Sequence, residues 1–555
     1  MFSVDAQRLN LRRTRQSCRV RVDSPLPATP RFQVPIGLYM KQLLICLMVL
    51  FGVLLFACIS SAATYYVDQS GGSDTNSGTS PSTPWKNCPG MASYSGSGTL
   101  IAGDTVYFDS ADTWLVTGTQ GIYLTGGVTY IGDSWGSGTR AEIKANANLE
   151  AGVVRFRDHA TYPTIFKGFN VNGNSKVTTG IDINHRYTSL MNGATKRVEN
   201  SEVHHTSSRQ ASGQYKYGII ISNHGGSGGY AENVEVINNI VHDISRDAIN
   251  LYPGDENASC RIKNITVRGN VVYNTGQDPD YSAGAGIIVK GYVVDAYIEN
   301  NYVYGTKGAG VFVNGNETNH FGVGPTNIHF RYNIVNASSV HGGIRIYDDG
   351  ADPKDIKIYG NILLNNTGTG GLSLDGNSGP LNLLVYNNTF YNAVVRFTNH
   401  NSTVNTLEFK NNIIYSAGAT PLAANSGNIK SSSNNIYNGS STLVTIGSTN
   451  YNSSNLTSFE STALSSNPLF VNTSNLPTGF TGTFGVNSQP NNDGLSLQPS
   501  SLAINSGATL AGTYAGSINS VARPQGAPWE RGAYESVPSG ADTTPPSPPG
   551  GVRLQ

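Results

Sequence analysis

Charged, amide and aromatic residues recur at two positions, two residues apart, in short apolar segments that mostly begin with glycine. Alternate side chains of a β-strand point to opposite faces, so Ile, Leu and Val would fill an interior while these positions face outward. Such a face would carry carboxylates, amides, aromatic rings, one lysine and two arginines, which suits a groove for an anionic sugar chain. The pairs are Asp182/Asn184, Ile220/Ser222, Asn250/Tyr252, Ile288/Lys290, Phe312/Asn314, Arg345/Tyr347, Ser373/Asp375 and Arg396/Thr398.

The elements that position these residues belong to a repeat that runs from about residue 165 to 420. Each unit has an apolar alternation around an Asn or an Asn pair, then a turn, then the glycine-led segment. One unit cannot bury its apolar face alone, whereas stacked units bury a continuous column. We therefore predict an all-β fold, a right-handed parallel β-helix with an N-terminal cap and an irregular C-terminal segment. The Asn positions are 239, 270, 301, 333, 361, 388 and 412.

The recurring Asn has a structural explanation that favours this fold over a β-sandwich. Asn tolerates a left-handed backbone at sharp turns, and its amide can form a ladder between successive coils. A sandwich with coincidental turns would not repeat the same phase seven times. The segment 81–91 can form a capping turn or short helix at the open N-terminal end.

Charge and composition limit the classes of partner. Lys and Arg equal Asp and Glu at 36 each over 555 residues, but residues 1–62 hold 8 of the basic and 2 of the acidic residues. The remainder carries 28 basic and 34 acidic residues, a net charge of −6. Nucleic-acid binding needs a basic stripe, so no nucleic-acid partner is expected.

The N-terminus predicts export. Leu43–Ile59 is an unbroken apolar run, and small residues follow it as a signal peptidase requires. Seventeen residues are short for a membrane span, so a retained anchor is the lesser alternative. We expect a disordered or mis-assigned start at 1–39, a signal peptide at 40–62, and a secreted or cell-surface monomer with no stable membrane partner after cleavage.

The C-terminal part predicts a closing segment and a linker. Beyond 420 the coils give way to Ser/Asn-rich loops, so we assign 63–536 to the β-helix domain. Residues 537–551 are a Pro-rich linker. Residues 552–555 look like the start of a truncated fibronectin type III-like module.

Three groups of residues resemble bacterial pectin-lyase-fold proteins. They are the opening Tyr65-Tyr66-Val67-Asp68, the Asn-ladder coils, and the ending Pro468-Leu469-Phe470 with Gly532-Ala533-Tyr534-Glu535. The resemblance covers about residues 64–536 and implies the fold. It implies activity only weakly, because this fold carries lyases, hydrolases, epimerases and binding proteins.

Within that group the chain weakly resembles family 9 pectate lyases, which carry an Asp-Asp-Gly-x-Asp run for calcium and a Lys base on the next coil. The matching register is Arg246-Asp247-Ala248-Ile249-Asn250, with Lys290 on the next coil. The resemblance implies Lys290 as the catalytic base and Asp247 and Asn250 as ligands of a Ca²⁺ cofactor. Arg246 and Asn250 replace two expected carboxylates, which puts calcium in doubt.

Lyases of this fold remove the proton α to a sugar carboxylate, which must be neutralised while the carbanion forms. Arg345, two coils beyond Lys290, could bind that carboxylate and would be the second catalytic residue. The other outward residues expected to bind substrate are Asn250, Tyr252, Asn314, Tyr347, Asp375 and Arg396.

Other motifs have weaker explanations. The run Asp348-Asp349-Gly350-Ala351-Asp352 follows its strand rather than entering it, so it is expected to be an acidic turn that could bind calcium. The histidines, His341 among them, are expected mostly at the surface of turns.

The leading hypothesis is a secreted lyase that cleaves an acidic, uronate-containing polysaccharide by β-elimination. Two alternatives remain open. One is a non-catalytic surface protein that binds glycan or mediates adhesion, and the other is a glycoside hydrolase that uses unpaired carboxylates such as Asp182 and Asp375. A compact cluster of Lys290, Arg345 and Asp247 would favour the lyase.

Overall fold

The computed structural model divides the chain into two units, Met1–Ser61 and Ala62–Gln555. The predicted segments 1–39 and 552–555, the acidic run from 349 to 352, and nearly all of the predicted signal peptide and linker lie outside the described residues. In the part described, no helix is long and apolar enough to cross a membrane. The structure describes residues 61–117, 120–149, 151–184, 193–206, 216–222, 230–253, 261–278, 284–315, 324–336, 341–348, 353–366, 370–376, 381–400, 406–526 and 528–537.

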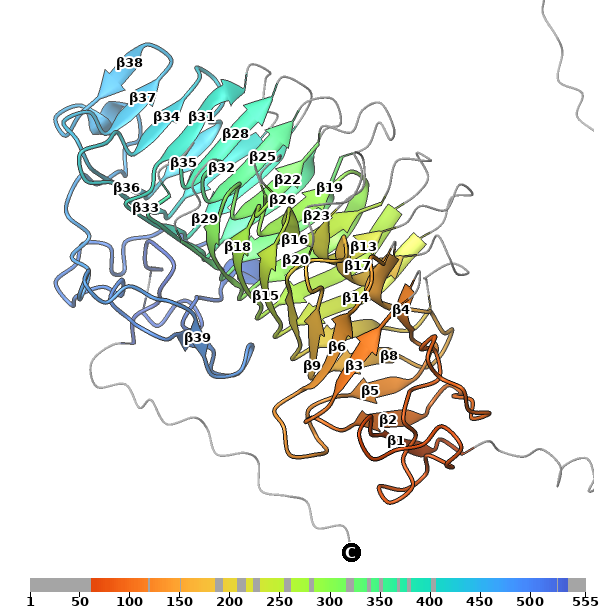
Figure 1. The fold of residues 1–555 in the computed structure, drawn as a ribbon. Coiled ribbons are helices and arrows are strands. Elements are labelled where there is room, and N and C mark those ends of the chain that lie inside the picture. The colour runs from red at the N-terminus through yellow and green to blue at the C-terminus, as the bar shows by residue number, and fades with distance from the viewer. Residues whose placement is uncertain are drawn as a thin grey trace, which may run out of the picture. The chain divides into compact units, whose positions relative to one another are not determined.

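The second unit is a right-handed parallel β-helix of three long sheets, as the repeat predicts (Figure 1). Sheet 1 has 13 parallel strands, and each pairs with the next one along the chain in this sheet. They are β1 (Thr64–Val67), β2 (Thr105–Phe108), β5 (Thr129–Ile131), β8 (Thr164–Lys167), β11 (Lys196–Glu199), β14 (Tyr230–Ile237), β17 (Arg261–Arg268), β20 (Val293–Glu299), β23 (Thr326–Arg331), β26 (Lys354–Tyr359), β29 (Asn382–Tyr386), β32 (Thr406–Lys410) and β35 (Ser431–Ser433).

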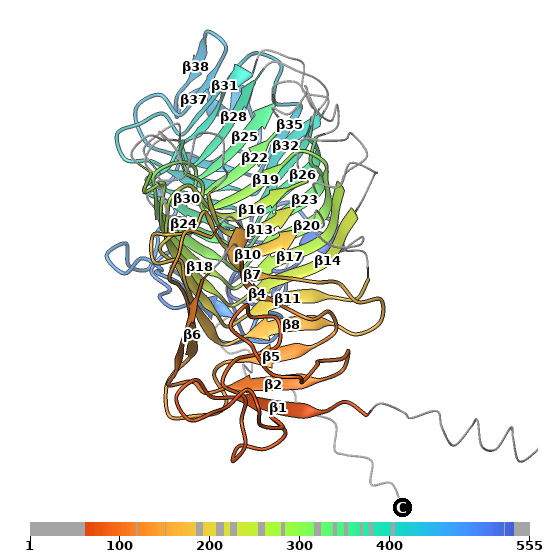
Figure 2. The ribbon, with the colours of Figure 1, turned by 45° about the vertical axis from the view of Figure 1, so that its right-hand side comes forward.

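Sheet 2 contains the glycine-led segments and runs up the face seen in Figure 2. Its last strand pairs antiparallel with the strand before it, which ends the parallel stack. The 13 strands are β4 (Gln120–Tyr123), β7 (Ala151–Arg155), β10 (Thr179–Asn184), β13 (Tyr217–Ser222), β16 (Asp247–Tyr252), β19 (Ile287–Lys290), β22 (Val311–Asn314), β25 (Ile344–Asp348), β28 (Leu372–Gly376), β31 (Val395–His400), β34 (Leu422–Ala424), β37 (Val444–Ile446) and β38 (Thr449–Tyr451).

Sheet 3 has 12 parallel strands and follows the Asn positions. They are β3 (Thr113–Val116), β6 (Ala141–Ala145), β9 (Phe169–Asn172), β12 (Glu202–His204), β15 (Ile240–Ile244), β18 (Val271–Thr275), β21 (Tyr302–Thr306), β24 (Ile334–Asn336), β27 (Ile362–Leu364), β30 (Thr389–Tyr391), β33 (Ile413–Tyr415) and β36 (Ile436–Asn438).

The Asn ladder is confirmed at the turn between sheets 1 and 3. Each Asn donates from its backbone N and its Nδ2 to the Oδ1 of the Asn on the next coil, with Nδ2–Oδ1 distances of 2.9–3.0 Å. The ladder extends one coil beyond the predicted set to Asn435, whose amide donates to Glu460 at 2.9 Å. The residue before each ladder Asn takes the left-handed backbone, as at Asn238 (φ 55°) and Gly269 (φ 69°). The left-handed backbone and the ladder hydrogen bonds, both predicted for one Asn, therefore belong to two neighbouring residues.

The leading glycine of the sheet 2 strands has a packing explanation. A Cβ on Gly180, Gly218 or Gly286 would lie within 2.5–2.6 Å of a valine Cγ1 from sheet 3. These valines belong to the buried column that also takes the alternate Ile, Leu and Val of sheet 2. Glycine at this point lets the chain enter the strand against the core.

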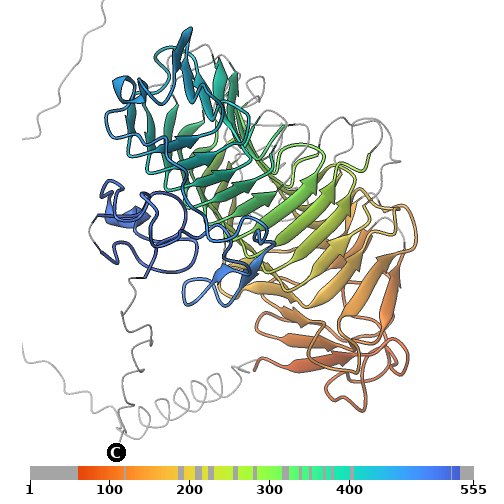
Figure 3. The same cartoon turned by 90° about the vertical axis from the view of Figure 1, so that its left-hand side faces the viewer.

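The ends of the column are covered differently. At the N-terminal end Trp85 is buried, its ring stacks on Tyr65 at 4.5 Å, and residues 81–91 form turns without a described helix. After β38 the chain packs back on the outer side of sheet 3 through Phe470, Leu497 and Tyr534 (Figure 3). This segment holds the 3₁₀ turns η2 (Leu456–Ser458) and η3 (Gly512–Tyr514) and the short pair β39 (Phe480–Thr481) and β40 (Gln489–Pro490).

Candidate functional site

The register of sheet 2 aligns the outward residues in two rows, as the sequence predicts. One row pairs Asp182, Ile220, Asn250, Ile288, Phe312, Arg345, Ser373 and Arg396 in succession. The second row contains Ser222 and Tyr252, and then Lys290, Asn314, Tyr347 and Asp375. A register shift after Ser373 pairs Asp375 with Asn399 rather than with Thr398, so the predicted second row is wrong at its last position.

Several of these outward residues are buried although they lie outside the interior core. Asn250 and Tyr252 are each 1% exposed and Asp375 is 5% exposed, whereas Lys290, Asn314, Arg345 and Tyr347 are half-buried. The face is therefore not a flat solvated sheet. Desolvation of this kind strengthens every charged contact on it.

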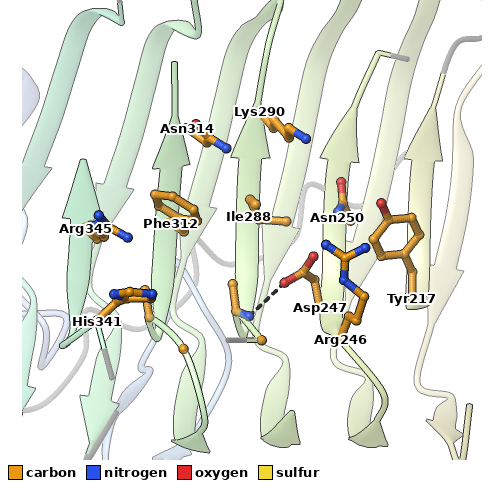
Figure 4. Close-up of a pocket in the computed structure, with 14 residues that line it drawn as sticks. Tyr217, Arg246, Asp247, Asn250, Ile288, Lys290, Phe312, Asn314, His341 and Arg345 are labelled. Carbon is orange, nitrogen blue, oxygen red and sulfur yellow. Dashed lines mark hydrogen bonds between the residues drawn. The ribbon is translucent and has the colours of Figure 1, made fainter. Parts of the chain in front are cut away.

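A pocket of about 260 Å³ lies on this face and spans strands β13 to β25 (Figure 4). Three cations line it, Arg246, Lys290 and Arg345, and Asp247 is the carboxylate in the lining. The excess of positive charge suits an anionic ligand, although the chain after residue 62 is net acidic. The remaining lining residues are Tyr217, Asn250, Gly284, Ala285, Ile288, Gly308, Ala309, Phe312, Asn314 and His341.

Arg345 lies at the β25 side of the pocket and contacts three side chains there. Its Nε donates to Asp375 Oδ2 at 2.7 Å, and its guanidinium lies 5.3 Å from the ring centre of Phe312 and 5.0 Å from that of Tyr347. Its Nη groups make no hydrogen bond to the described part of the chain. A guanidinium fixed through Nε presents a planar donor pair suited to a carboxylate.

Lys290 stands at the end of β19 and leans toward β16. Its Nζ lies 4.4 Å from the ring centre of Tyr252, the outward residue of that strand. Figure 4 shows the amine directed to the side of Asn250 and away from Arg345. The contact is a cation–π interaction for the protonated amine.

Asp247, Asn250 and Arg246 form the β16 side of the pocket. Asp247 Oδ1 accepts the backbone N–H of Ala285 at 2.8 Å. Burial raises the pKa of Asp247, while that hydrogen bond and the charges of Arg246 and Lys290 hold part of the rise back. Asn250 Oδ1 is buried and has no hydrogen-bond partner among the described residues.

This donor set does not fit calcium. Ca²⁺ takes six to eight oxygen ligands, but the β16 side offers one carboxylate and one amide beside a guanidinium and an ammonium. The described residues contain no group of three His, Cys, Asp or Glu residues arranged to hold a metal ion. No chemical step is therefore derived through calcium, and the predicted Asp247–Asn250 metal site stays an untested prediction.

The hydrolase alternative assumed unpaired carboxylates, and that assumption is wrong. Asp375 pairs with Arg345, and Asp182 pairs with Arg155 at 3.2 Å. Asp182 and Arg155 are 7% and 3% exposed, so their pair is almost fully desolvated. Each carboxylate is committed to a neighbouring arginine on its own sheet face.

Asp182→Asn is expected to change how stability depends on pH. Burial raises the pKa of Asp182 from 3.8 to about 6, against the opposing charge of Arg155. The folded state thus holds this proton more tightly than the unfolded state, and the stabilisation is present below pH 4 and lost as pH rises through 6. Relative to the Asn variant, the free energy of unfolding of the wild type should fall by about 2 kcal/mol between pH 4 and pH 7. Urea unfolding midpoints of both proteins at the two pH values test this, and an equal difference at both would contradict it.

The structure brings together most but not all of the residues predicted for the site. Lys290, Arg345, Asp247, Asn250 and Asn314 line the pocket, and Tyr252, Tyr347 and Asp375 contact its cations. Arg396 is not among the lining residues.

The Nη1 of Arg396 donates to the backbone oxygens of Val395 and Thr420, so this arginine is engaged with the backbone of its own coil and of the next one. Tyr217, Arg246 and His341 were not predicted as site residues. His341 is half-buried in the pocket rather than at the surface of a turn, and burial lowers its pKa. Arg246 could have been found in the sequence because it directly precedes Asp247. Tyr217 could have been found because the phase of the repeat pairs it with Asp247 on the next coil.

Comparisons with known proteins give the following likenesses. A family model described as disaggregatase related matches residues 231–379. No curated protein matches this chain in sequence. The crystal structure of pectate lyase Pel9A is 15% identical over 86% of this chain and 97% of its own, with a TM-score of 0.44. The GH136 lacto-N-biosidase of Eubacterium ramulus is 15% identical over 70% and 66%, with a TM-score of 0.42.

A third solved structure is the A-module of the mannuronan C-5 epimerase AlgE4 from Azotobacter vinelandii. It is 14% identical over 65% of this chain and 91% of its own, with a TM-score of 0.37. These likenesses are in the parallel β-helix fold alone, so the function of this chain rests on its site.

Proposed function

We propose that this chain binds an acidic polysaccharide along sheet 2 and cleaves it at a uronate by β-elimination. The observation that carries the proposal is that Lys290, Arg345 and Asp247 line one pocket, with cations in excess. A scatter of these residues over a flat face would instead have favoured a binding protein. Export, predicted from residues 40–62, is part of the same proposal.

The proposed reaction uses groups that the chain itself supplies. Lys290 Nζ, in its neutral form, takes the proton from C5 of a uronate. The electron pair of that C–H bond moves toward the carboxylate and then forms the C4–C5 double bond, as the bond from C4 to the linking oxygen breaks. The leaving oxygen takes a proton from water, and the hydroxide so formed takes the proton from the Lys290 ammonium, which restores the neutral amine. Arg345 binds a carboxylate of the polymer, since its guanidinium is already oriented by Asp375 and two aromatic rings.

The test is the ultraviolet absorbance of an unsaturated uronate product. The full chain is incubated with polygalacturonate, alginate and chondroitin, with calcium or with a chelator. A rise on at least one polymer supports elimination. Reducing ends without that absorbance would indicate hydrolysis, and retention on a glycan column without either signal would indicate a binding protein.

Arg345→Lys is expected to raise KM about tenfold with a smaller change in kcat. Lysine keeps the charge but loses the planar donor pair and the contacts with Phe312 and Tyr347. One lost charge-assisted hydrogen bond is worth on the order of 1.5–3 kcal/mol. Steady-state kinetics on the cleaved polymer measure this, and a kcat loss at unchanged KM would contradict a role in binding.

A further inference from the structure

The β16 side of the pocket holds a second arginine, on the opposite side of Lys290 from Arg345. Arg246 directly precedes β16 and lines the same pocket. In Figure 4 its guanidinium rises beside Asp247, between Asn250 and Tyr217. The pocket is therefore cationic at both ends, and Lys290 stands between the two arginines.

Lys290 is closer to the Arg246 end than to the Arg345 end. Its strand, β19, is adjacent to β16 and two strands from β25, a separation across the sheet of about 5 Å against about 10 Å. The backbone of Arg246 lies before β16, but its long side chain brings the guanidinium up beside Asn250, on the side to which the Lys290 amine is directed (Figure 4). The side chain also leans toward β16, where its Nζ lies over the Tyr252 ring. The reacting carbon and its carboxylate are joined by one bond, so the cation that neutralises the carboxylate must stand near the base.

The neighbours of Arg246 favour an organic anion over a metal ion. Asp247 has its own donor in Ala285 N–H, and its carboxyl feels the charges of both Arg246 and Lys290. A divalent cation placed among them would be repelled by two positive charges and held by too few oxygens. A sugar carboxylate would be attracted by the guanidinium of Arg246, which keeps its charge when Lys290 acts as the neutral base.

Asn250 gives an independent indication of a ligand. It is 1% exposed, it lines the pocket, and its Oδ1 has no hydrogen-bond partner in the described part of the chain. A buried acceptor without a partner is costly, and native structures generally have a reason for one. A sugar hydroxyl next to the carboxylate would supply the missing donor.

We infer that Arg246 binds the carboxylate of the sugar whose proton Lys290 removes, so that the site neutralises this charge with a guanidinium and needs no calcium. Asn250 accepts a hydroxyl of the same sugar, and Arg345 binds an acidic group further along the polymer. Negative charge that moves onto the carboxylate as the C5–H bond breaks is then stabilised by Arg246. This assignment rests on the proposed function for the identity of the reacting sugar.

The experiment measures binding by titration calorimetry in the full chain. Lys290→Ala is the common background, because it prevents turnover during the measurement. The probes are tetrasaccharides of galacturonate, mannuronate and guluronate and a chondroitin tetrasaccharide, each in EDTA and in calcium chloride. We expect at least one to bind with equal affinity in both buffers.

Adding Arg246→Ala to the same background should weaken that binding on the order of tenfold to a hundredfold, and Arg246→Lys should weaken it less. Arg197→Ala is the matched control, since Arg197 pairs with Glu235 on sheet 1, and it should change nothing. Thermal unfolding checks that each variant is folded.

Three results would overturn the inference: binding that needs calcium, binding unchanged by Arg246→Ala, or no binding of any probe. Its failure is distinguishable from that of the proposed function. Calcium-free binding through Arg246 with no unsaturated product from wild type would end the lyase proposal and leave Arg246 as a residue that binds a sugar carboxylate. Product formation with an Arg246→Ala variant that binds normally would end this inference alone.

Discussion

Replacing Lys290 with alanine is expected to reduce formation of unsaturated uronate by about a thousandfold, because a positioned general base contributes roughly 10²–10⁴ to a rate. Lys290 lies at the pocket next to Tyr252, and no other lysine of the described residues lines that pocket. The measurement is the initial rate of ultraviolet absorbance on the polymer that the wild type cleaves.

Lys290→Arg separates base chemistry from charge. Arginine keeps the positive charge over Tyr252 but does not deprotonate in proteins, so this variant should bind the polymer and remain inactive. Affinity electrophoresis in a gel containing the polymer checks binding. Substantial activity in either variant would show that another group takes the proton.

Asn301→Ala is expected to lower the free energy of unfolding by about 3–5 kcal/mol. Asn301 is fully buried in the middle of the ladder. Its amide donates to Asn333 and to the backbone oxygen of Val267, and its Oδ1 accepts from the backbone N and Nδ2 of Asn270. Alanine would leave several buried groups without partners, each costing roughly 1–3 kcal/mol.

The matched control is Asn238→Gly, one position before a ladder Asn. Asn238 is exposed and has φ 55°, a conformation that glycine adopts without strain. The equivalent residues on two other coils are already glycine in this chain, Gly269 and Gly360. Urea denaturation followed by circular dichroism should show a large shift in midpoint for Asn301→Ala and little shift for Asn238→Gly. Equal shifts would mean that the ladder contributes little.

Much of the fold could be predicted because its determinants are local and repeated. The Asn positions recur every 24 to 32 residues in the same phase of the repeat. The same side chain meets its copy on the next coil, so one strand spacing predicts the ladder. The same alternation predicted the outward rows through Lys290 and Arg345. The register shift between Ser373 and Asp375 was not predictable, because a bulge depends on how the two neighbouring strands pair.

The site was harder to predict because it depends on side-chain direction and on pairing across coils. Asp182 and Asp375 looked like two separate carboxylates in the sequence, yet each meets an arginine 27 or 30 residues away. Arg246 looked like the loss of an expected carboxylate, and only its place in the pocket beside Lys290 shows what a cation can do there.

The sequence by itself determined the coil repeat, the buried column, the Asn ladder and the face on which Lys290 and Arg345 stand. These follow from side-chain alternation and from identical residues that stack at one strand spacing. The tertiary structure decided which charges neutralise one another, which outward residues are desolvated, and that Arg246, Lys290 and Arg345 share one pocket. Charges interact over a few ångströms in space, and residues on adjacent coils that meet at that distance are about 30 residues apart in the chain.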